Sequence, residues 1–280
     1  MKSAILYTAP VNQLLELGTP HEIEDWSRYL ELGITEADIP ELARMAIDEH
    51  LFDSEEDDDD NSYYGMIHAW RVLAQLQTDQ AIEPLINALT YWGNMEEFWD
   101  WSSEEIPAAL GRLGPSALPA LAQVMANTKN GQDARQDAVE AVKQIFKCHP
   151  TSRETCLQIL TSQLEHFAKN DPDLNAYLVM TLAVDMKAVE TADLIEQAYQ
   201  SRRVNEDFIG DWDEAQVYLG LKQESEVPKR HRNILMNPWE YRKPEPIGFT
   251  IGKSKKPKTE AKAKRKLQSQ SRKKNRSKRK

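Results

Sequence analysis

The sequence predicts an all-α protein, a right-handed solenoid of stacked helical hairpins with capping helices at its ends and a disordered tail. Only 11 of the 280 residues are glycine, and the alternation of apolar and polar residues that is typical of strands is rare. Apolar residues instead recur at helical spacing, and pairs of such segments repeat about every 36 residues. Hydrophobic residues make up 40% of the chain, enough for a substantial core.

Residues 1–63 are expected to form capping helices followed by an acidic loop. A first helix is predicted to follow a capping box at residues 19–22 and to end at Gly33, a residue suited to the left-handed position after a helix. A second is predicted to begin near Asp38 or Pro40. Repulsion among the acids of residues 53–60 favours an exposed loop. The apolar residues expected to face the core in the first helix are Ile23, Trp26, Tyr29 and Leu30.

Residues 64–225 are predicted to contain four helical hairpins. The first two match at a spacing of 36 residues, which pairs Leu85 with Leu121. An ungapped offset of 109 residues pairs Leu85 with Leu194 of the fourth hairpin. One hairpin has too little core to be stable alone, so each is expected to stack on its neighbours. A last helix, starting at Asp211 and ending at Gly220, is expected to close the array.

The repeated segments resemble a known family. Residues 81–86 read Ala-Ile-Glu-Pro-Leu-Ile, and residues 110–121 read Leu-Gly-Arg-Leu-Gly-Pro-Ser-Ala-Leu-Pro-Ala-Leu. Both resemble the HEAT repeat family, specifically the short bacterial HEAT-like repeats first noted in phycobilisome (PBS) bilin lyases. The resemblance covers residues 64–199, and the flanking segments resemble an uncharacterised bacterial group related to HEAT proteins. It implies stacked hairpins but no active site, because the functions of that family range from lyase subunits to scaffolds.

No catalytic or metal-binding constellation is expected. The sequence has no Gly-x-Ser-x-Gly, His-Glu-x-x-His or Cys-x-x-Cys motif, and its six histidines include no pair three or four residues apart. Cys148 is the only weak candidate for a nucleophile. We therefore predict a protein that is not an enzyme and that uses no metal or cofactor. With two cysteines and no apolar run near the roughly 20 residues that span a bilayer, the sequence favours a cytoplasmic location without membrane contact.

Four aromatic residues are candidates for binding a protein partner. Trp92, Phe98 and Trp99 lie between the first two hairpins, and Trp239 lies in residues 226–252, which are predicted to be an extended linker. Packing in the core is one interpretation of these residues. The other is an exposed aromatic patch, which would mark a partner site. The sequence leaves both open.

Residues 253–280 are predicted to form a disordered basic tail. They hold 15 of the 35 Lys and Arg residues and one of the 45 acids, so the tail carries +14 and residues 1–252 carry −24. Such a tail suits phosphate contacts with RNA or the ribosome, with low sequence selectivity because it has no aromatic residue. An inert extension, contact with an acidic protein surface and a nuclear address are the alternatives. The candidate contacts are Lys262, Lys264, Arg265, Lys266, Arg272, Lys273, Lys274, Arg276, Lys278, Arg279 and Lys280.

These features predict a non-enzymatic adaptor. Its helical surface is expected to bind a protein partner, while its tail contacts RNA or ribosome phosphates. The alternative, which the family resemblance implies, is a subunit of a lyase or chaperone that acts on a cofactor-bearing protein such as a phycobiliprotein.

Overall fold

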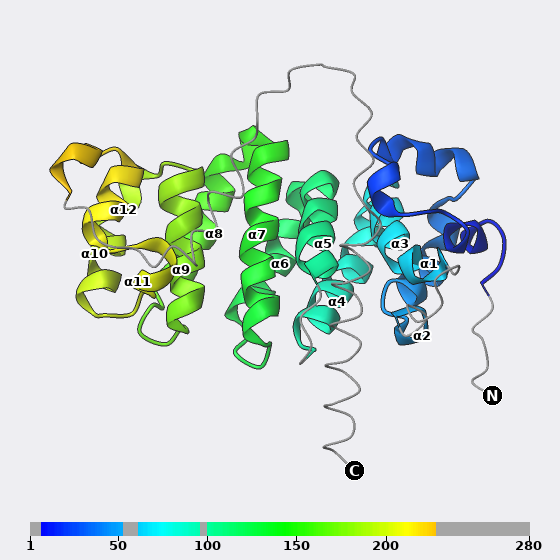
Figure 1. The fold of residues 1–280 in the computed structure, drawn as a ribbon, viewed down its shortest axis with the longest axis horizontal. Coiled ribbons are helices and arrows are strands. Elements are labelled where there is room, and N and C mark those ends of the chain that lie inside the picture. Colours follow the sequence, from blue (N-terminus) through cyan, green and yellow to red (C-terminus); the bar gives the residue numbers. More distant parts are fainter. Residues whose placement is uncertain (1–6, 53–60, 96–99, 228–280) are drawn as a thin grey trace, which may run out of the picture. The chain divides into compact units, whose positions relative to one another are not determined.

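A computed structural model describes residues 7–52, 61–95 and 100–227. The chain divides into two units, Met1–Met236 and Asn237–Lys280, and every described residue belongs to the first. These residues form helices and contain no strand (Figure 1). The predicted all-α class is therefore confirmed for this part of the chain. The predicted acidic loop at residues 53–60 and the basic tail lie outside the described residues.

The N-terminal part consists of short 3-10 segments and two short α-helices. In chain order these are η1 (Val11–Leu15), η2 (Pro20–Glu22), η3 (Trp26–Leu32), η4 (Glu36–Asp38), α1 (Ile39–Met45), α2 (Glu49–Phe52) and η6 (Asn61–Tyr64). The start of α1 agrees with the predicted second helix.

The first predicted helix is wrong in its form. Residues 20–32 form two 3-10 segments, and Thr19 makes no capping hydrogen bond. A 3-10 segment has three residues per turn, so residues three apart share one face. Trp26 and Tyr29 are accordingly buried, whereas Leu30, which was expected in the core, is 46% exposed. Gly33 ends the segment with φ 76°, as predicted.

Four pairs of helices follow. They are α3 (Gly65–Gln75) with α4 (Ile82–Gly93), α5 (Asp100–Leu113) with α6 (Leu118–Ala126), α7 (Gln132–Cys148) with α8 (Arg153–Leu164), and α9 (Pro172–Met180) with α10 (Ala192–Gln200). A π-helical turn at Thr181–Asp185 extends α9. The short helices α11 (Glu206–Ile209) and α12 (Trp212–Leu219) and the 3-10 turn η12 (Glu224–Glu226) come last. Helix α12 has the predicted limits, with an Asp211–Glu214 capping box and Gly220 at φ 80°.

The second helix of every pair begins in the same way. A 3-10 turn precedes it, and the last residue of that turn is buried. These residues are Ala81, Ala117, Ser152 and Thr191. The four helices begin 36, 35 and 39 residues apart, close to the predicted period.

The predicted offset between the first and fourth pairs is wrong by one residue. An offset of 110, not 109, matches buried positions with buried positions, such as Leu85 with Ile195 and Ala88 with Ala198. The sequence comparison had paired the buried Leu85 with Leu194, which is only half-buried. Apolar identity alone does not show which of two adjacent residues faces the core.

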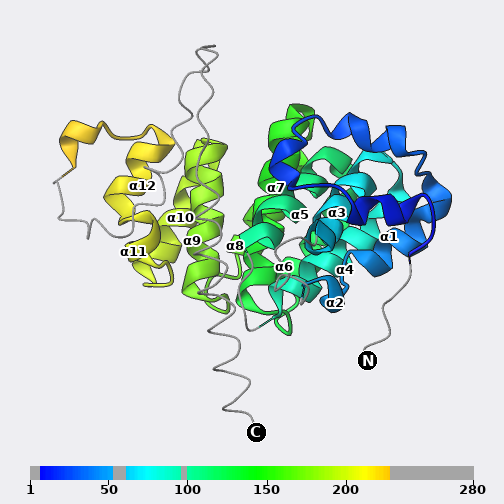
Figure 2. The ribbon, with the colours of Figure 1, turned by 45° about the vertical axis from the view of Figure 1, so that its right-hand side comes forward.

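Neighbouring pairs pack helix on helix in two layers (Figures 1 and 2). The first helices contact one another in the order α3, α5, α7, α9, and the second helices in the order α4, α6, α8. Helix α3 also contacts α1 and η3. Because these elements cover it from several sides, α3 is buried at every residue from Gly65 to Ala74, not only along the predicted stripe.

Candidate functional site

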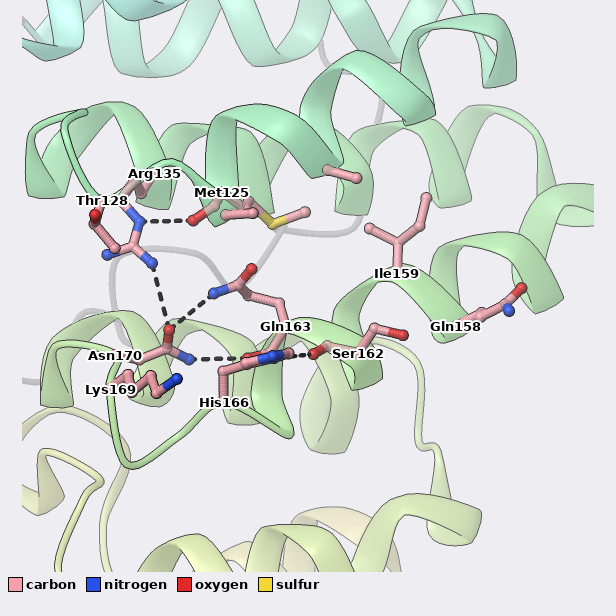
Figure 3. Close-up of a pocket in the computed structure, with 12 residues that line it drawn as sticks. Met125, Thr128, Arg135, Gln158, Ile159, Ser162, Gln163, His166, Lys169 and Asn170 are labelled. Carbon is pink, nitrogen blue, oxygen red and sulfur yellow. Dashed lines mark hydrogen bonds between the residues drawn. The ribbon is translucent and has the colours of Figure 1, made fainter.

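A cleft of about 500 Å³ lies between α6, the start of α7, α8 and the turn that follows α8 (Figure 3). This volume is typical of sites that hold a small molecule or a few side chains. Ala122, Met125 and Ile159 contribute apolar surface. The polar part includes cationic and neutral side chains but no Asp or Glu, although the chain as a whole is acidic.

The cleft exists because α8 packs differently from the other second helices. Seven residues after the buried end of the 3-10 turn, the other pairs place Ala88, Val124 and Ala198, all of which are buried. The equivalent residue of α8 is Ile159, which is half-buried and lines the cleft. An apolar side chain that is covered elsewhere in the repeat is therefore accessible here.

Arg135 is the buried cation of the cleft. It lies on the face of α7 that also carries Ala138 and Val142, so helical spacing turns it inward, and its side chain is 7% exposed. Its Nε donates to the carbonyl oxygen of Met125 at 2.7 Å, and its Nη2 donates to Asn170 Oδ1 at 3.3 Å. The Met125 carbonyl belongs to the last turn of α6, where a cation is favoured by the helix dipole.

Asn170 joins the cleft to the next helical pair. Its Oδ1 accepts hydrogen bonds from Arg135 and, at 2.8 Å, from Gln163 Nε2. Its Nδ2 donates to the Gln163 carbonyl oxygen and to Asn175 Oδ1, each at 2.9 Å. Arg203 Nη2 donates to the Asn170 carbonyl oxygen at 2.5 Å. Figure 3 shows Arg135, Gln163 and Asn170 pointing toward one another. This network fixes the position of the Arg135 guanidinium.

The charge of Arg135 is not balanced by a contacting carboxylate. Within residues 7–52, 61–95 and 100–227, no acid lies within 4.0 Å of its guanidinium nitrogens. Burial lowers the pKa of Arg135, while the more distant charge of Asp171 acts in the opposite direction. Lys169 and His166 add basic groups at the exposed edge of the cleft. The arrangement is suited to binding an anion.

Arg71 provides the contrast. It is also buried, on α3, but its Nε and Nη2 donate to Glu105 of α5 at 2.7 and 2.5 Å. Its Nη1 donates to the carbonyl oxygens of Pro20 and Ile23. Burial alone lowers the pKa of Arg71, but Glu105 raises it above its usual value overall. This arginine is fully engaged within the protein and holds the N-terminal segments against α3.

The aromatic candidates are only partly within the described residues. Trp92 is 3% exposed, and its Nε1 donates to the carbonyl oxygen of Ala46 at 2.9 Å. The interpretation of Trp92 as part of an exposed partner patch is therefore wrong, and its interpretation as a core residue is confirmed. Phe98, Trp99 and Trp239 lie outside the described residues, as do all candidate contacts in residues 262–280.

Other classes of site were also considered. Among the described residues, no group of three or more His, Cys, Asp or Glu side chains is arranged to hold a metal ion. No helix in the same part of the chain is long and apolar enough to cross a membrane. Cys148 is exposed, and Cys156 is buried beside Ser152.

Comparison with protein families gives one match. The family model described as "Protein of unknown function (DUF1186)" matches residues 35–237, more than half of the chain. The chain belongs to the DUF1186 family. The matched region begins just before α1 and contains the four helical pairs and the cleft. No curated protein and no solved structure matches the chain.

The sequence analysis did not identify the cleft residues. One signal was available for Arg135, because it falls on the same helical face as Ala138 and Val142, where an apolar residue is expected. For Gln163 and Asn170 the sequence offered no such signal. They lie in α8 and in the turn after it, and meet Arg135 only through the packing of α8 against α6 and α7.

Proposed function

We propose that this protein is a non-enzymatic, cytoplasmic adaptor that binds a protein partner in the cleft between α6 and α8. The observation that carries the proposal is the cleft itself, which combines accessible apolar surface with a buried cation that has no contacting acid. Side chains that would act as nucleophile and base are not gathered there, whereas apolar contact and a charged anchor are what a binding site needs.

The fold proposed for the adaptor is a right-handed HEAT-like solenoid. Two observations support it. Each second helix begins after the same 3-10 turn at intervals of 35 to 39 residues, and neighbouring pairs pack first helix on first helix and second on second. Proteins built from such repeats bind partners along extended surfaces made by successive repeats. The cleft, formed by the second and third pairs, is a natural place for such a contact.

The basic tail is proposed to tether the adaptor to RNA or ribosome phosphates. Charge segregation supports this role, because residues 253–280 carry +14 and the rest of the chain carries −24. The acidic part would be repelled by a polyanion, which leaves the tail as the contact. Binding to single-stranded RNA should then weaken with salt, with a slope of about −0.7 in log affinity against log salt for each phosphate neutralised.

Affinity purification tests both halves. The full chain, a form lacking residues 253–280 and the variant Ala122→Trp are compared, each with and without nuclease. The new indole fills the cleft, so we expect the protein partner to be lost from Ala122→Trp and to survive nuclease with the full chain. Gln123→Trp is the matched control, because Gln123 is the next residue of α6, is exposed and does not line the cleft.

RNA retention is expected to disappear with the tail. Retention that is unchanged in the shortened chain at low salt would refute the tether. Absence of any reproducible protein partner of the full chain, or equal recovery of the partner by Ala122→Trp and wild type, would refute the cleft as the partner site.

A further inference from the structure

We propose that the cleft recognises a carboxylate on its partner, namely an Asp or Glu side chain next to an aliphatic residue in a peptide segment, with Arg135 as the anchor. This inference rests on the proposed function as a protein-binding adaptor. It adds the chemical class of the partner and the residue that selects it.

Arg135 has hydrogen-bonding capacity left for a ligand. A guanidinium carries five N–H donors. The hydrogen bonds of Arg135 within the described residues use two nitrogens, Nε and Nη2, for Met125 and Asn170, and Nη1 makes none. Charges that are buried in proteins are normally paired. A carboxylate that accepts from the remaining donors would supply both the missing charge and the missing acceptors.

The other buried cations of the described residues support this comparison. Arg71 is paired with Glu105, and Lys143, 2% exposed, is paired with Glu140 one turn away. Arg135 is the exception, and it is the one of the three that lines the cleft. The position without a partner inside the protein is the position that a ligand can reach.

The lining favours a carboxylate over a phosphate. A phosphate group carries between one and two negative charges at neutral pH and is usually held by several cations. Arg135 is the only buried cation among the lining residues, and Gln163 and Asn170 beside it are neutral. Lys169 and His166 are exposed at the edge, where solvent screens their charge. One buried charge matches the single charge of a carboxylate, and the planar guanidinium fork matches its two oxygens.

The size of the cleft favours a peptide over a lone anion. A carboxyl group fills a small part of about 500 Å³. The remaining wall includes Ala122, Met125 and Ile159, which suit an aliphatic neighbour of the acid. Gln158 and Ser162 are exposed on the same side of α8 and can bond a peptide backbone.

Asn170 acts as a positioning residue. Its Oδ1 accepts from Arg135 Nη2, and its other bonds run to Gln163 and Asn175. The guanidinium is therefore held between the Met125 carbonyl and Asn170 before any ligand arrives, which reduces the entropy lost on binding.

A selection from random twelve-residue peptides displayed on phage tests the inference. The full chain is the target, and Arg135→Met is used for counter-selection. We expect the selected peptides to be enriched in Asp or Glu beside an aliphatic residue. Replacing that Glu by Gln, or Arg135 by Met, should each weaken binding by about tenfold or more, since each removes a charge-assisted hydrogen-bonded pair. The two changes combined should weaken it little further.

Further variants separate the charge of Arg135 from its shape and from general effects. Arg135→Lys keeps the charge but not the fork, and is expected to bind with intermediate affinity. Arg153→Met removes an arginine from α8 that is paired with Glu190 and does not line the cleft, so it should bind like wild type. Thermal unfolding of each variant shows whether it is folded.

Several outcomes overturn the inference. They are no enrichment of acids, no selected peptide although a partner co-purifies, equal binding to wild type and a folded Arg135→Met, or clearly tighter binding when phosphoserine replaces the selected Glu. If selected peptides or a co-purified partner bind Arg135→Met as well as wild type but are lost from Ala122→Trp, the adaptor stands and the carboxylate anchor does not. If neither a peptide nor a partner binds the full chain, the proposed function fails first.

Discussion

The surroundings of Arg71 and Arg135 differ in one respect that separates a structural role from a binding role. Both arginines are buried and lie on the first helix of a pair. Glu105 balances Arg71 from the neighbouring helix α5, and the carbonyl oxygens of Pro20 and Ile23 take its remaining donors. Arg135 has a carbonyl and an amide as partners and opens onto a cleft. Burial alone therefore does not reveal function, whereas burial without a counter-charge beside a cavity does.

Helix α7 extends the contrast to an acid. Asp137, two residues after Arg135, is 8% exposed and accepts a hydrogen bond from Ser103 Oγ at 3.1 Å. It forms no ion pair within the described part of the chain. Residues two apart on a helix point to different sides, so α7 directs a buried cation toward the cleft and a buried acid toward α5. The predictions below test whether these groups behave as paired and unpaired charges should.

The largest effect is expected from breaking the paired site. Glu105→Gln leaves the Arg71 charge buried without its counter-charge, and should lower the free energy of unfolding by about 3–5 kcal/mol. Chemical denaturation at neutral pH measures the loss. Glu190→Gln is the control, because it breaks an exposed ion pair with Arg153 and should cost less than about 1 kcal/mol. Equal losses for the two variants would contradict the special role of the Arg71 pair.

Asp137 should make stability fall as pH rises. Burial, followed by the nearby charges of Asp133 and Glu140, raises the pKa of Asp137 to about 7 despite the hydrogen bond from Ser103. Its folded pKa lies above its unfolded value, so its contribution is fully present below about pH 4 and is lost as pH rises through 7.

The variant Asp137→Asn removes this dependence. Between pH 4 and pH 8 its stability relative to wild type should improve by about 4 kcal/mol at most. Denaturation curves at the two pH values measure the change. Asp193→Asn, at an exposed position of α10, should show no comparable change.

His68, next to Arg71 in the chain, should act with the opposite sign. Burial is the main reason that the pKa of His68 is lowered to about 4, and the charge of Arg71 adds to it. The neutral ring fits its partners, since Nε2 donates to the Gly18 carbonyl oxygen at 3.0 Å and Nδ1 accepts from Tyr29 Oη at 2.7 Å.

A folded pKa below the unfolded value means that this contribution is present above about pH 6.5 and is lost as pH falls through 4. Wild type should thus lose about 3 kcal/mol more than His68→Asn between pH 7 and pH 4. The exposed His166 supplies the control variant His166→Asn. A titration of the His68 ring by NMR that gives an ordinary pKa would contradict the prediction.

The smallest effect is expected at the unpaired arginine. Arg135→Met loses two hydrogen bonds but also removes a buried charge that has no contacting acid, so its stability should stay within about 1 kcal/mol of wild type. Arg71→Met, which strands Glu105, should cost several times more. If Arg135→Met is as destabilising as Arg71→Met, Arg135 is a structural residue and the comparison fails.

Local signals in the sequence were sufficient for the helical class and for the ends of several helices. Apolar spacing predicted helices, Gly33 and Gly220 ended segments with positive φ, and Asp211 began α12. These features depend on a few adjacent residues, and so they can be derived without knowledge of the fold. The charge of residues 253–280 is likewise a property of composition alone.

Packing between distant segments decided the rest. Leu30 is exposed because its segment is a 3-10 helix, α3 is buried on every side because η3, α1 and α5 cover it, and Trp92 lies in the core because it reaches Ala46. The cleft depends on how α8 meets α6 and α7, and the same is true of the contrast between Arg71 and Arg135. A sequence shows which residues carry charge, but only the tertiary contacts determine which charge has a partner, because that partner comes from a segment far away along the chain.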